Sequence, residues 1–348
     1  MNKSIINRSI KNQSRIENRV DSFSEHKQKS TDNIVAMNTS AIFSRNKTAV
    51  ITGASSGIGK AAAIMCASKG MHVFLVDIDE EDLSRALVDV QNASIFDTQV
   101  IKDMIVDVSN EKEMKSLASI VYNSHHVSSV NFLMNNAAIS LGGGAMADMD
   151  KFHDLFSVNT IGPIHGCQAF IPLMKKKGEI GLVVNTGSKQ GITAPPGNLI
   201  YNVSKAALKT WTEGLEHELR TDRFEKKGNI YSALLIPGWV NTSINLKEER
   251  TRAQTEGRAF DEDKVFFHEN KPAPGAWMPM QVIEFMLKEL NEGKFYIVCP
   301  DNDVDRETDN LRMTWAMQDI TQDRPPLSRW HPDWKDKFSE YLEQNKKR

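Results

Sequence analysis

The sequence is poor in cysteine, in long apolar runs and in net charge, and each shortage excludes a class of protein. Its three cysteines, Cys66, Cys167 and Cys299, are too few and too far apart for a disulfide framework or a zinc site. No apolar run approaches the ~20 residues of a membrane-spanning helix, and no signal-peptide stretch opens the chain. A formal net charge of -2 gives no general attraction to nucleic acid. We expect a cytoplasmic protein that binds a small molecule, with no nucleic acid, no membrane span and no metal site.

Large apolar residues are also scarce in residues 1–45, which are rich in Ser, Asn, Lys and Arg. Such a segment buries too little surface to offset the entropy lost on ordering, so we predict a disordered extension. Import into an organelle is an alternative, because Arg8, Arg15 and Arg19 suit a transit peptide. Acids such as Glu17 argue against it, since transit peptides avoid them.

Residues 46–300 alternate short apolar runs with helical patterns, which predicts a single α/β domain. The expected strands are 48–52, 72–76, 100–106, 130–134, 181–184, 230–236 and 295–298, and the expected helices are 59–69, 82–92, 111–122, 148–177, 199–220 and 280–292. Alternation of this kind requires crossover connections, hence a doubly wound parallel sheet, or Rossmann fold, of about seven strands by this count.

Two segments interrupt or follow this alternation. Residues 241–279 are charged and then rich in Pro and Gly, which favours a lid or binding loop. The tail, 301–348, is polar but contains Trp315, Trp330 and Trp334, so we expect it to dock on the domain or on another subunit.

A glycine-rich turn follows the first predicted strand. Thr52–Gly59 contains Gly53, Gly57 and Gly59, which allow a tight turn and close approach of the backbone to phosphate groups. The helix behind the turn presents free N–H groups to a diphosphate. Asp77, at the end of the second strand, is placed to accept hydrogen bonds from a ribose and would repel the additional phosphate of NADP. This arrangement favours NAD, with NADP as the alternative.

Tyr201 and Lys205 lie four residues apart on a predicted helix, so their side chains share one face. A free tyrosine has a pKa near ~10, too high for efficient proton transfer at neutral pH. A neighbouring ammonium group favours the phenolate, so we expect Lys205 to lower the pKa of Tyr201.

Together these motifs resemble the short-chain dehydrogenase/reductase superfamily, in its single-domain subgroup, over about residues 47–300. The matching cofactor motifs are the glycine motif with Gly53, Ser55, Ser56, Gly57, Ile58 and Gly59, and the adenine contact at Asp107 and Val108. The segment Asn135, Asn136, Ala137 and Ala138 resembles the NNAG signature, with Ala138 replacing the usual Gly. The catalytic positions match at Asn159, Ser188, Tyr201 and Lys205, and the segment after the sixth strand matches at Pro237, Gly238, Val240 and Thr242.

The resemblance implies hydride transfer between a nicotinamide cofactor and a secondary alcohol or ketone. Tyr201 would transfer the proton, Ser188 would hold the substrate oxygen, Lys205 would assist Tyr201, and Asn159 would position a relay water. Ser55, Ser56, Ile58, Asp107, Val108, Asn135, Ala137, Pro237, Gly238, Val240 and Thr242 would contact the cofactor together with the glycines and Asp77. The family also implies a homodimer or homotetramer.

Two other functions fit parts of the pattern. A dinucleotide-binding sensor or scaffold could use the same fold, although such proteins usually lose the Tyr or the Lys. An epimerase or dehydratase of the extended subgroup would also carry Tyr-x-x-x-Lys, but with TGxxGxxG rather than the glycine spacing found here. Phe260, Phe266, Phe267 and Trp277 in the lid segment favour a fairly apolar substrate.

Overall fold

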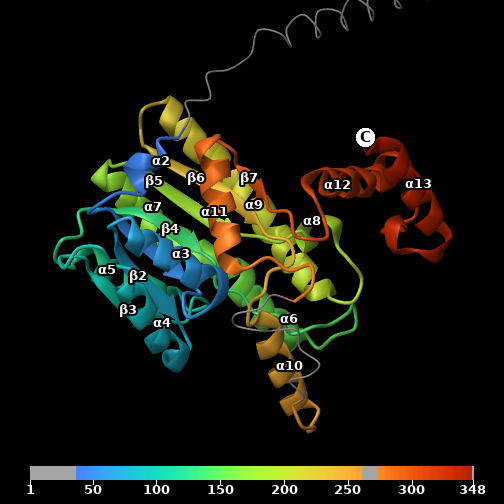
Figure 1. Ribbon diagram of the computed structural model, residues 1–348, viewed down its shortest axis with the longest axis horizontal. Helices are drawn as coiled ribbons and strands as arrows, with labels where there is room; N and C mark the ends of the chain where they lie inside the picture. The colour runs from blue at the N-terminus through green and yellow to red at the C-terminus, as the bar shows by residue number, and fades with distance from the viewer. Residues whose placement is uncertain (1–36, 261–272, 347–348) are drawn as a thin grey trace, which may run out of the picture. The chain divides into compact units, whose positions relative to one another are not determined.

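The computed structural model describes residues 37–260 and 273–346. Within them, seven parallel strands form one sheet in the order β3-β2-β1-β4-β5-β6-β7 (Figure 1). The strands are β1 (Thr48–Thr52), β2 (His72–Asp77), β3 (Ile101–Ile105), β4 (Val130–Asn135), β5 (Gly181–Thr186), β6 (Ile230–Ile236) and β7 (Tyr296–Val298). The predicted fold class is confirmed. The strand order reverses between β1 and β4, and open parallel sheets bind ligands at the carboxyl ends of the strands beside such a reversal.

Helices cover both faces of this sheet. They are α3 (Gly57–Ser68), α4 (Glu80–Asn92), α5 (Glu111–Tyr122), α7 (Gly162–Lys177), α9 (Leu199–Phe224) and α11 (Pro279–Asn291). One core joins the strands to α5, α7 and α9 and contains the fully buried Phe74, Leu133 and Phe170. On the other face α3 packs against α4 and α11 (Figure 1). Because both faces are covered, β1, β4 and β5 are buried along their whole length.

The end of the predicted extension is ordered. Thr39–Ile42 form the short helix α2, Ile42 is fully buried, and the Phe43 ring centroid lies 4.9 Å from that of Phe132. The prediction of disorder over 1–45 therefore needs correction for its last residues, where two apolar side chains anchor the segment to the core. Residues 1–36 lie outside the described part of the chain.

The single helix predicted over 148–177 has three parts. α6 (Met149–Phe156) and α7 are joined by a π-helical segment, Ser157–Ile161. π-helical turns within helices are often found at functional sites, because the additional residue shifts which side chains face inward. Asn159 is in this segment and is fully buried.

The predicted lid segment contains a helix as well as loops. α10 (Ile244–Thr255) lies in its first half, and a bridge pairs Val240 with Trp277 across the segment. Between β5 and α9 there is a further short helix, α8 (Gln190–Thr193). Two lid residues from the substrate prediction, Phe266 and Phe267, lie outside the described residues.

The tail forms α12 (Arg306–Thr321) and α13 (Lys335–Asn345), which pack around Trp315. The ring centroids of Phe338 and Tyr341 lie 5.2 and 5.0 Å from that of Trp315, whose indole N–H donates to Ser328 Oγ at 2.8 Å. Asp309 of α12 pairs with Lys189, next to α8, at 2.6 Å. The tail is thereby connected to the loop that follows β5.

Two further observations concern the whole of the described chain. None of the helices in residues 37–260 and 273–346 is long and apolar enough to cross a bilayer. Cys66, Cys167 and Cys299 are each buried and free.

Candidate active site

A cavity of about 1020 Å³ opens at the carboxyl ends of the strands, beside the reversal between β1 and β4. Most of the residues predicted from the sequence line it: Gly53, Ser55, Ser56, Gly57, Ile58, Asp77, Asp107, Val108, Ala137, Ser188, Tyr201, Lys205, Pro237, Gly238, Val240 and Thr242. Gly59, Asn135 and Asn159 are not among the residues that line it. Segments separated by up to ~190 residues of sequence thus meet at one edge of the sheet, as the fold requires.

The glycine turn is shaped for close backbone approach. Gly53 and Gly57 have positive φ angles of 65° and 54°, and a Cβ on Gly53 would lie 2.8 Å from the Cα of Ala137. A Cβ on Gly59 would lie 2.1 Å from the carbonyl oxygen of Gly53, so this glycine allows α3 to pack on the turn rather than contacting a ligand. The first N–H groups of α3 adjoin the cavity, an arrangement that suits a diphosphate.

Asp77 is the last residue of β2, and Asp107 lies two residues after β3 at the same edge of the sheet. Asp77 accepts hydrogen bonds from the backbone N–H of Ser55 at 3.1 Å and of Ile78 at 2.8 Å. It therefore braces the glycine turn while lining the cavity. Asp107 accepts from the N–H and hydroxyl of Ser109, at 2.9 and 2.7 Å, which fixes the turn after β3.

Two adjacent asparagines, Asn135 at the end of β4 and Asn136 after it, have different surroundings. The side-chain NH₂ of Asn135 donates to Asn185 Oδ1 at 2.8 Å, and a Cβ on Gly166 would lie 2.2 Å from Asn135 Oδ1. Asn135 thus ties β4 to β5 and α7 instead of lining the cavity. Asn136 lines it, and accepts from the Thr186 hydroxyl at 3.2 Å.

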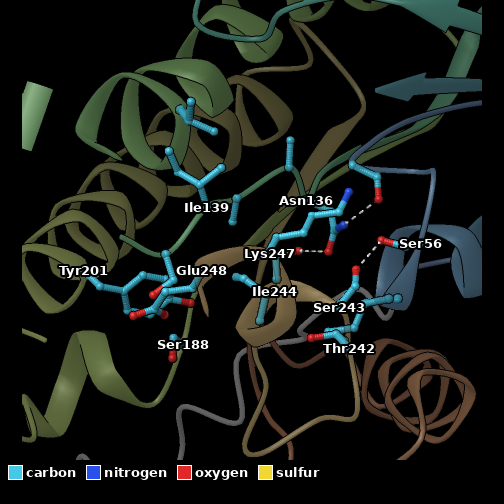
Figure 2. A pocket seen from close by; sticks show the side chains of 18 of the residues that line it. Ser56, Asn136, Ile139, Ser188, Tyr201, Thr242, Ser243, Ile244, Lys247 and Glu248 are labelled. Atoms are coloured by element: carbon cyan, nitrogen blue, oxygen red, sulfur yellow. Dashed lines mark hydrogen bonds between the residues drawn. The ribbon is translucent and has the colours of Figure 1, made fainter. Parts of the chain in front are cut away.

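The predicted proton-transfer residues, Ser188, Tyr201 and Lys205, line the same cavity. Tyr201 and Lys205 are one turn apart on α9, and the Lys205 Nζ lies 5.7 Å from the centre of the Tyr201 ring. Lys205 Nζ donates to the Thr186 carbonyl oxygen at 2.8 Å, which holds the side chain in place. Ser188 follows β5 and its hydroxyl interacts with the Tyr201 phenol. Figure 2 shows Ser188 and Tyr201 in the same part of the pocket.

Burial sets the protonation of this pair. It raises the pKa of Tyr201 to about 12; the Ser188 hydroxyl opposes the shift and the charge of Glu248 adds to it. Burial also lowers the pKa of Lys205 to about 7, so its amine is only partly charged near neutral pH. The causes of the shift in the pKa of Tyr201 are burial, Ser188 and Glu248, and the expected lowering by Lys205 is not among them. The phenol keeps its proton.

Asn159 acts on the backbone beside this pair. Its Oδ1 accepts from the N–H of Ile139 at 2.8 Å, and its Nδ2 donates to the carbonyl oxygen of Ile139 at 2.9 Å. Nδ2 also lies 3.3 Å from the hydroxyl of Ser204, which precedes Lys205. The amide therefore fixes the loop after β4 relative to α9.

The comparisons with known proteins agree with this geometry. Residues 47–253 match the short chain dehydrogenase family. The chain belongs to this family. The enzyme is 30% identical over 248 residues to the 3-ketodihydrosphingosine reductase of Bos taurus, covering 71% of this chain and 69% of the relative.

Solved structures of this family resemble the enzyme in fold. A short chain dehydrogenase/reductase from Burkholderia phymatum, in complex with NAD, aligns with a TM-score of 0.65 and 30% identity, over 82% of this chain and 97% of the other. A short-chain dehydrogenase from Sphingobium yanoikuyae, in complex with NADPH, aligns with a TM-score of 0.60 and 22% identity, over 80% and 95% of the two chains, and shows the fold alone. The enzyme is an oxidoreductase of the short-chain type.

One face of α10 lines the cavity and was not singled out from the sequence. It carries Ile244, Lys247, Glu248 and Thr251, whose spacing of three and four residues defines a single helix face. The run from Lys247 to Arg252 reads as a solvated helix because it is highly charged. The spacing was the available signal, but only the fold shows which face turns inward.

The flap formed by residues 242–248 reaches across the cavity to the glycine turn. Ser243 Oγ lies 3.0 Å from Ser56 Oγ, and Lys247 Nζ pairs with Asp79 Oδ2 at 2.9 Å (Figure 2 shows Lys247, Ser243 and Ser56). Lys247 also lies 3.3 Å from Asp82. The Lys247 ammonium group therefore lies near Asp77 and Asp79, although no lysine or arginine is adjacent to these two residues in the sequence.

Proposed function

We propose that the enzyme transfers a hydride between a nicotinamide cofactor and a small ketone or secondary alcohol. One observation carries the proposal: Ser188, Tyr201 and Lys205 open into the same cavity as the glycine turn at the start of α3. The turn suits a dinucleotide phosphate, and the phenol suits proton transfer, so the two halves of the reaction meet in one space.

The residues of the turn fit a dinucleotide. Gly53 and Gly57 leave its backbone open, and the N–H groups of α3 suit the diphosphate. Asp77 would bind the adenosine ribose, which supports NAD over NADP. By family resemblance, Asp107 and Val108 would border the adenine, and Ala137, Pro237, Gly238, Val240 and Thr242 would border the nicotinamide. When bound, the cofactor supplies or accepts the hydride; the protein orients it and manages the proton.

The protonation of Tyr201 suits the proton-donating step of ketone reduction. Because its pKa is about 12, the phenol carries a proton at neutral pH and can donate it to a carbonyl oxygen. Ser188 would donate a second hydrogen bond to that oxygen. Lys205, with a pKa of about 7, can take up and return a proton near neutral pH. The bovine relative is a reductase of a keto compound by its name, which supports a ketone substrate.

The lining also supports a partly apolar substrate. Ile139, Leu141, Trp239 and Ile244 line the same cavity as the predicted proton donor. A homodimer or homotetramer remains part of the proposal, and light scattering of the purified protein measures it.

The proposal is tested by following NADH and NADPH at 340 nm with a panel of ketones. Tyr201→Phe removes the proton donor and keeps the ring, so we expect turnover to fall by roughly 10²–10⁴-fold while NADH still binds. Tyr296→Phe is the matched control, because this tyrosine lies on β7 and contacts Glu213 outside the cavity. Near-normal turnover by Tyr201→Phe would refute the assignment. Cofactor binding without turnover in the unmodified enzyme would favour the sensor alternative, and a preference for NADPH would refute the role of Asp77.

A further inference from the structure

Three stretches of the cavity wall follow neighbouring strands of the sheet. β5, β6 and β7 are adjacent and parallel, so the residues after these strands lie side by side at the carboxyl edge. Lys189 lies three residues after β5, Trp239 three after β6, and Asp301 three after β7. All three residues line the cavity. The start of the tail is therefore part of the wall that also carries Ser188.

The Asp301 carboxylate joins the other two stretches. Its Oδ2 accepts from the backbone N–H of Trp239 at 3.3 Å and from Lys189 Nζ at 3.2 Å. A Cβ on Gly238 would lie 2.5 Å from the same oxygen and 2.8 Å from Lys189 Nζ, so the glycine leaves room for this close approach. Only 8% of the Asp301 side chain is exposed. The tail thus holds the stretches after β5 and β6 together.

A carboxylate suits this position because the groups bonded to it are donors. Its other oxygen, Oδ1, accepts from the backbone N–H groups of Asp303 at 3.2 Å and Val304 at 2.8 Å. An ionised carboxylate accepts at both oxygens, whereas an amide has one accepting oxygen and an NH₂ group that donates. With asparagine here, the NH₂ group would face either the N–H groups of the turn or those of Lys189 and Trp239, donor against donor.

Resting on the proposed function, we propose that Asp301 is a positioning residue for hydride transfer: it fixes the stretch after β5 against the stretch after β6, and so keeps the Ser188 hydroxyl aligned with the nicotinamide. Ser188 precedes Lys189 and lines the same cavity as Tyr201, and the stretch after β6 would border the nicotinamide. A small displacement of either stretch lowers the rate, because the reacting atoms must meet in one geometry. The tail then contributes to the reaction from outside the family match at residues 47–253.

Asp301→Asn should loosen both contacts at once. We expect the Kd for NADH to rise by about 5–20-fold, because the stretch that borders the nicotinamide loses its fixed position. We expect kcat for a ketone to fall by about 10–100-fold, because Ser188 is no longer aligned. Titration of NADH fluorescence measures the Kd, and initial rates at saturating NADH and ketone measure kcat.

Asp309→Asn is the matched comparison. It also removes one carboxylate from Lys189, at 2.6 Å, but leaves Asp301 at the Trp239 N–H. We expect its Kd for NADH to stay within about twofold of that of the unmodified enzyme, since the Trp239 bond survives, and its kcat to fall less than in Asp301→Asn. An equal rise in Kd for the two variants, or an unchanged Kd in both, would overturn the proposal and leave Asp301 a structural role only.

Gly238→Ala opens the same contact from the other side while both carboxylates remain. Gly238 is not one of the glycines with a positive φ angle, so alanine fits the backbone there, but its methyl group would enter the space at Asp301 and Lys189. We expect a higher Kd for NADH and a lower kcat, as in Asp301→Asn. This variant carries the test if Asp301→Asn does not fold, and an unchanged Kd and kcat in it would refute the proposal.

Failure of the proposed function has a different signature. If no ketone oxidises NADH or NADPH with the unmodified enzyme, the oxidoreductase proposal for ketones fails, and amide hydrogen exchange of the enzyme without ligands decides the role of Asp301. Faster exchange at residues 237–239 in Asp301→Asn, but not in Asp309→Asn, supports Asp301 as the residue that positions this wall of the cavity. Equal exchange in the two variants refutes it.

Discussion

Lys205 is held in a fully buried position by one hydrogen bond, to the Thr186 carbonyl oxygen. Burial lowers its pKa from 10.5 to about 7. Above pH 10.5 the amine is neutral in both the folded and the unfolded chain. Between pH 10.5 and about 7 the unfolded chain binds a proton that the folded chain lacks, so the free energy of unfolding falls as the pH falls through this window. Below about pH 7 the folded chain is protonated as well, and the loss in the free energy of unfolding has reached its full size.

Lys205→Met should remove that cost. We expect the melting temperature at pH 7 to rise by about 2–6 °C and its dependence on pH between 7 and 10 to flatten, while turnover is lost. Thermal unfolding followed by circular dichroism at several pH values measures both. Lys209→Met is the control, because Lys209 lies on the same helix but pairs with Glu213 in a partly exposed position. An unchanged difference between pH 7 and pH 10 would contradict the buried, poorly protonated amine.

Individual residues also show how much of the site could be predicted from the sequence. The order of Ser188, Tyr201 and Lys205 predicted that they would meet, because strand ends and one helix face converge in a parallel sheet. The choice between Asn135 and Asn136 could not be made in this way. Which of two adjacent side chains turns into the core depends on how β4 ends and on what α7 presents, here Gly166.

Among the helices, α10 connects the two ends of the cavity. Lys247 pairs with Asp79 and Asp82, which lie at the start of α4 beside the end of β2. Burial lowers the pKa of Lys247, but its bond to Asp79 and the surrounding carboxylates raise it overall, so the amine stays charged. It offsets negative charge where we place the anionic cofactor.

Lys247→Met should therefore weaken cofactor binding. Without the cation, the carboxylates at this end repel the diphosphate, and the flap loses its attachment to α4. We expect the Kd for NADH to rise by about 3–10-fold at low ionic strength, with the difference shrinking as salt screens the charges. NADH fluorescence at two salt concentrations measures this, with Lys288→Met of α11 as the control. An equal Kd for variant and unmodified enzyme at low salt would show that the ion pair has no part in binding.

The regular elements were predictable and the irregular ones were not. Apolar runs and helical periodicity located all seven strands of the described sheet and its main helices, because burial on both faces leaves a strong pattern. The π-helical segment at Ser157–Ile161 leaves no such mark, since one additional residue in a helix does not alter composition. α10 was obscured by its charge, which resembles a solvated surface.

Across the whole molecule, the tail is connected to the loop that carries Ser188. Lys189 pairs with Asp309 of α12 at 2.6 Å and with Asp301 at 3.2 Å. Burial raises the pKa of Asp309, while the bond to Lys189 opposes that shift. Two carboxylates around one ammonium form a buried cluster between chain segments more than 100 residues apart.

Asp309→Asn should weaken the ion-pair cluster around Lys189 without removing it. One carboxylate remains for Lys189, so we expect a loss of about 1–3 kcal/mol in the free energy of unfolding. Turnover should fall as well, because Ser188 adjoins Lys189. Urea unfolding and steady-state kinetics measure the two effects, and Asp323→Asn, in an exposed turn of the tail, is the control. If the variant unfolds at the same urea concentration as the control, the cluster does not hold the tail.

The burial of all three thiols lowers their reactivity toward oxidants. Burial raises the pKa of Cys167 and Cys299 to about 12 and that of Cys66 still further. A thiol that neither ionises nor meets solvent reacts slowly with peroxides and alkylating agents. Because none of the three lines the cavity of the proposed active site, we expect peroxides and alkylating agents that inactivate thiol-dependent enzymes to leave turnover unchanged.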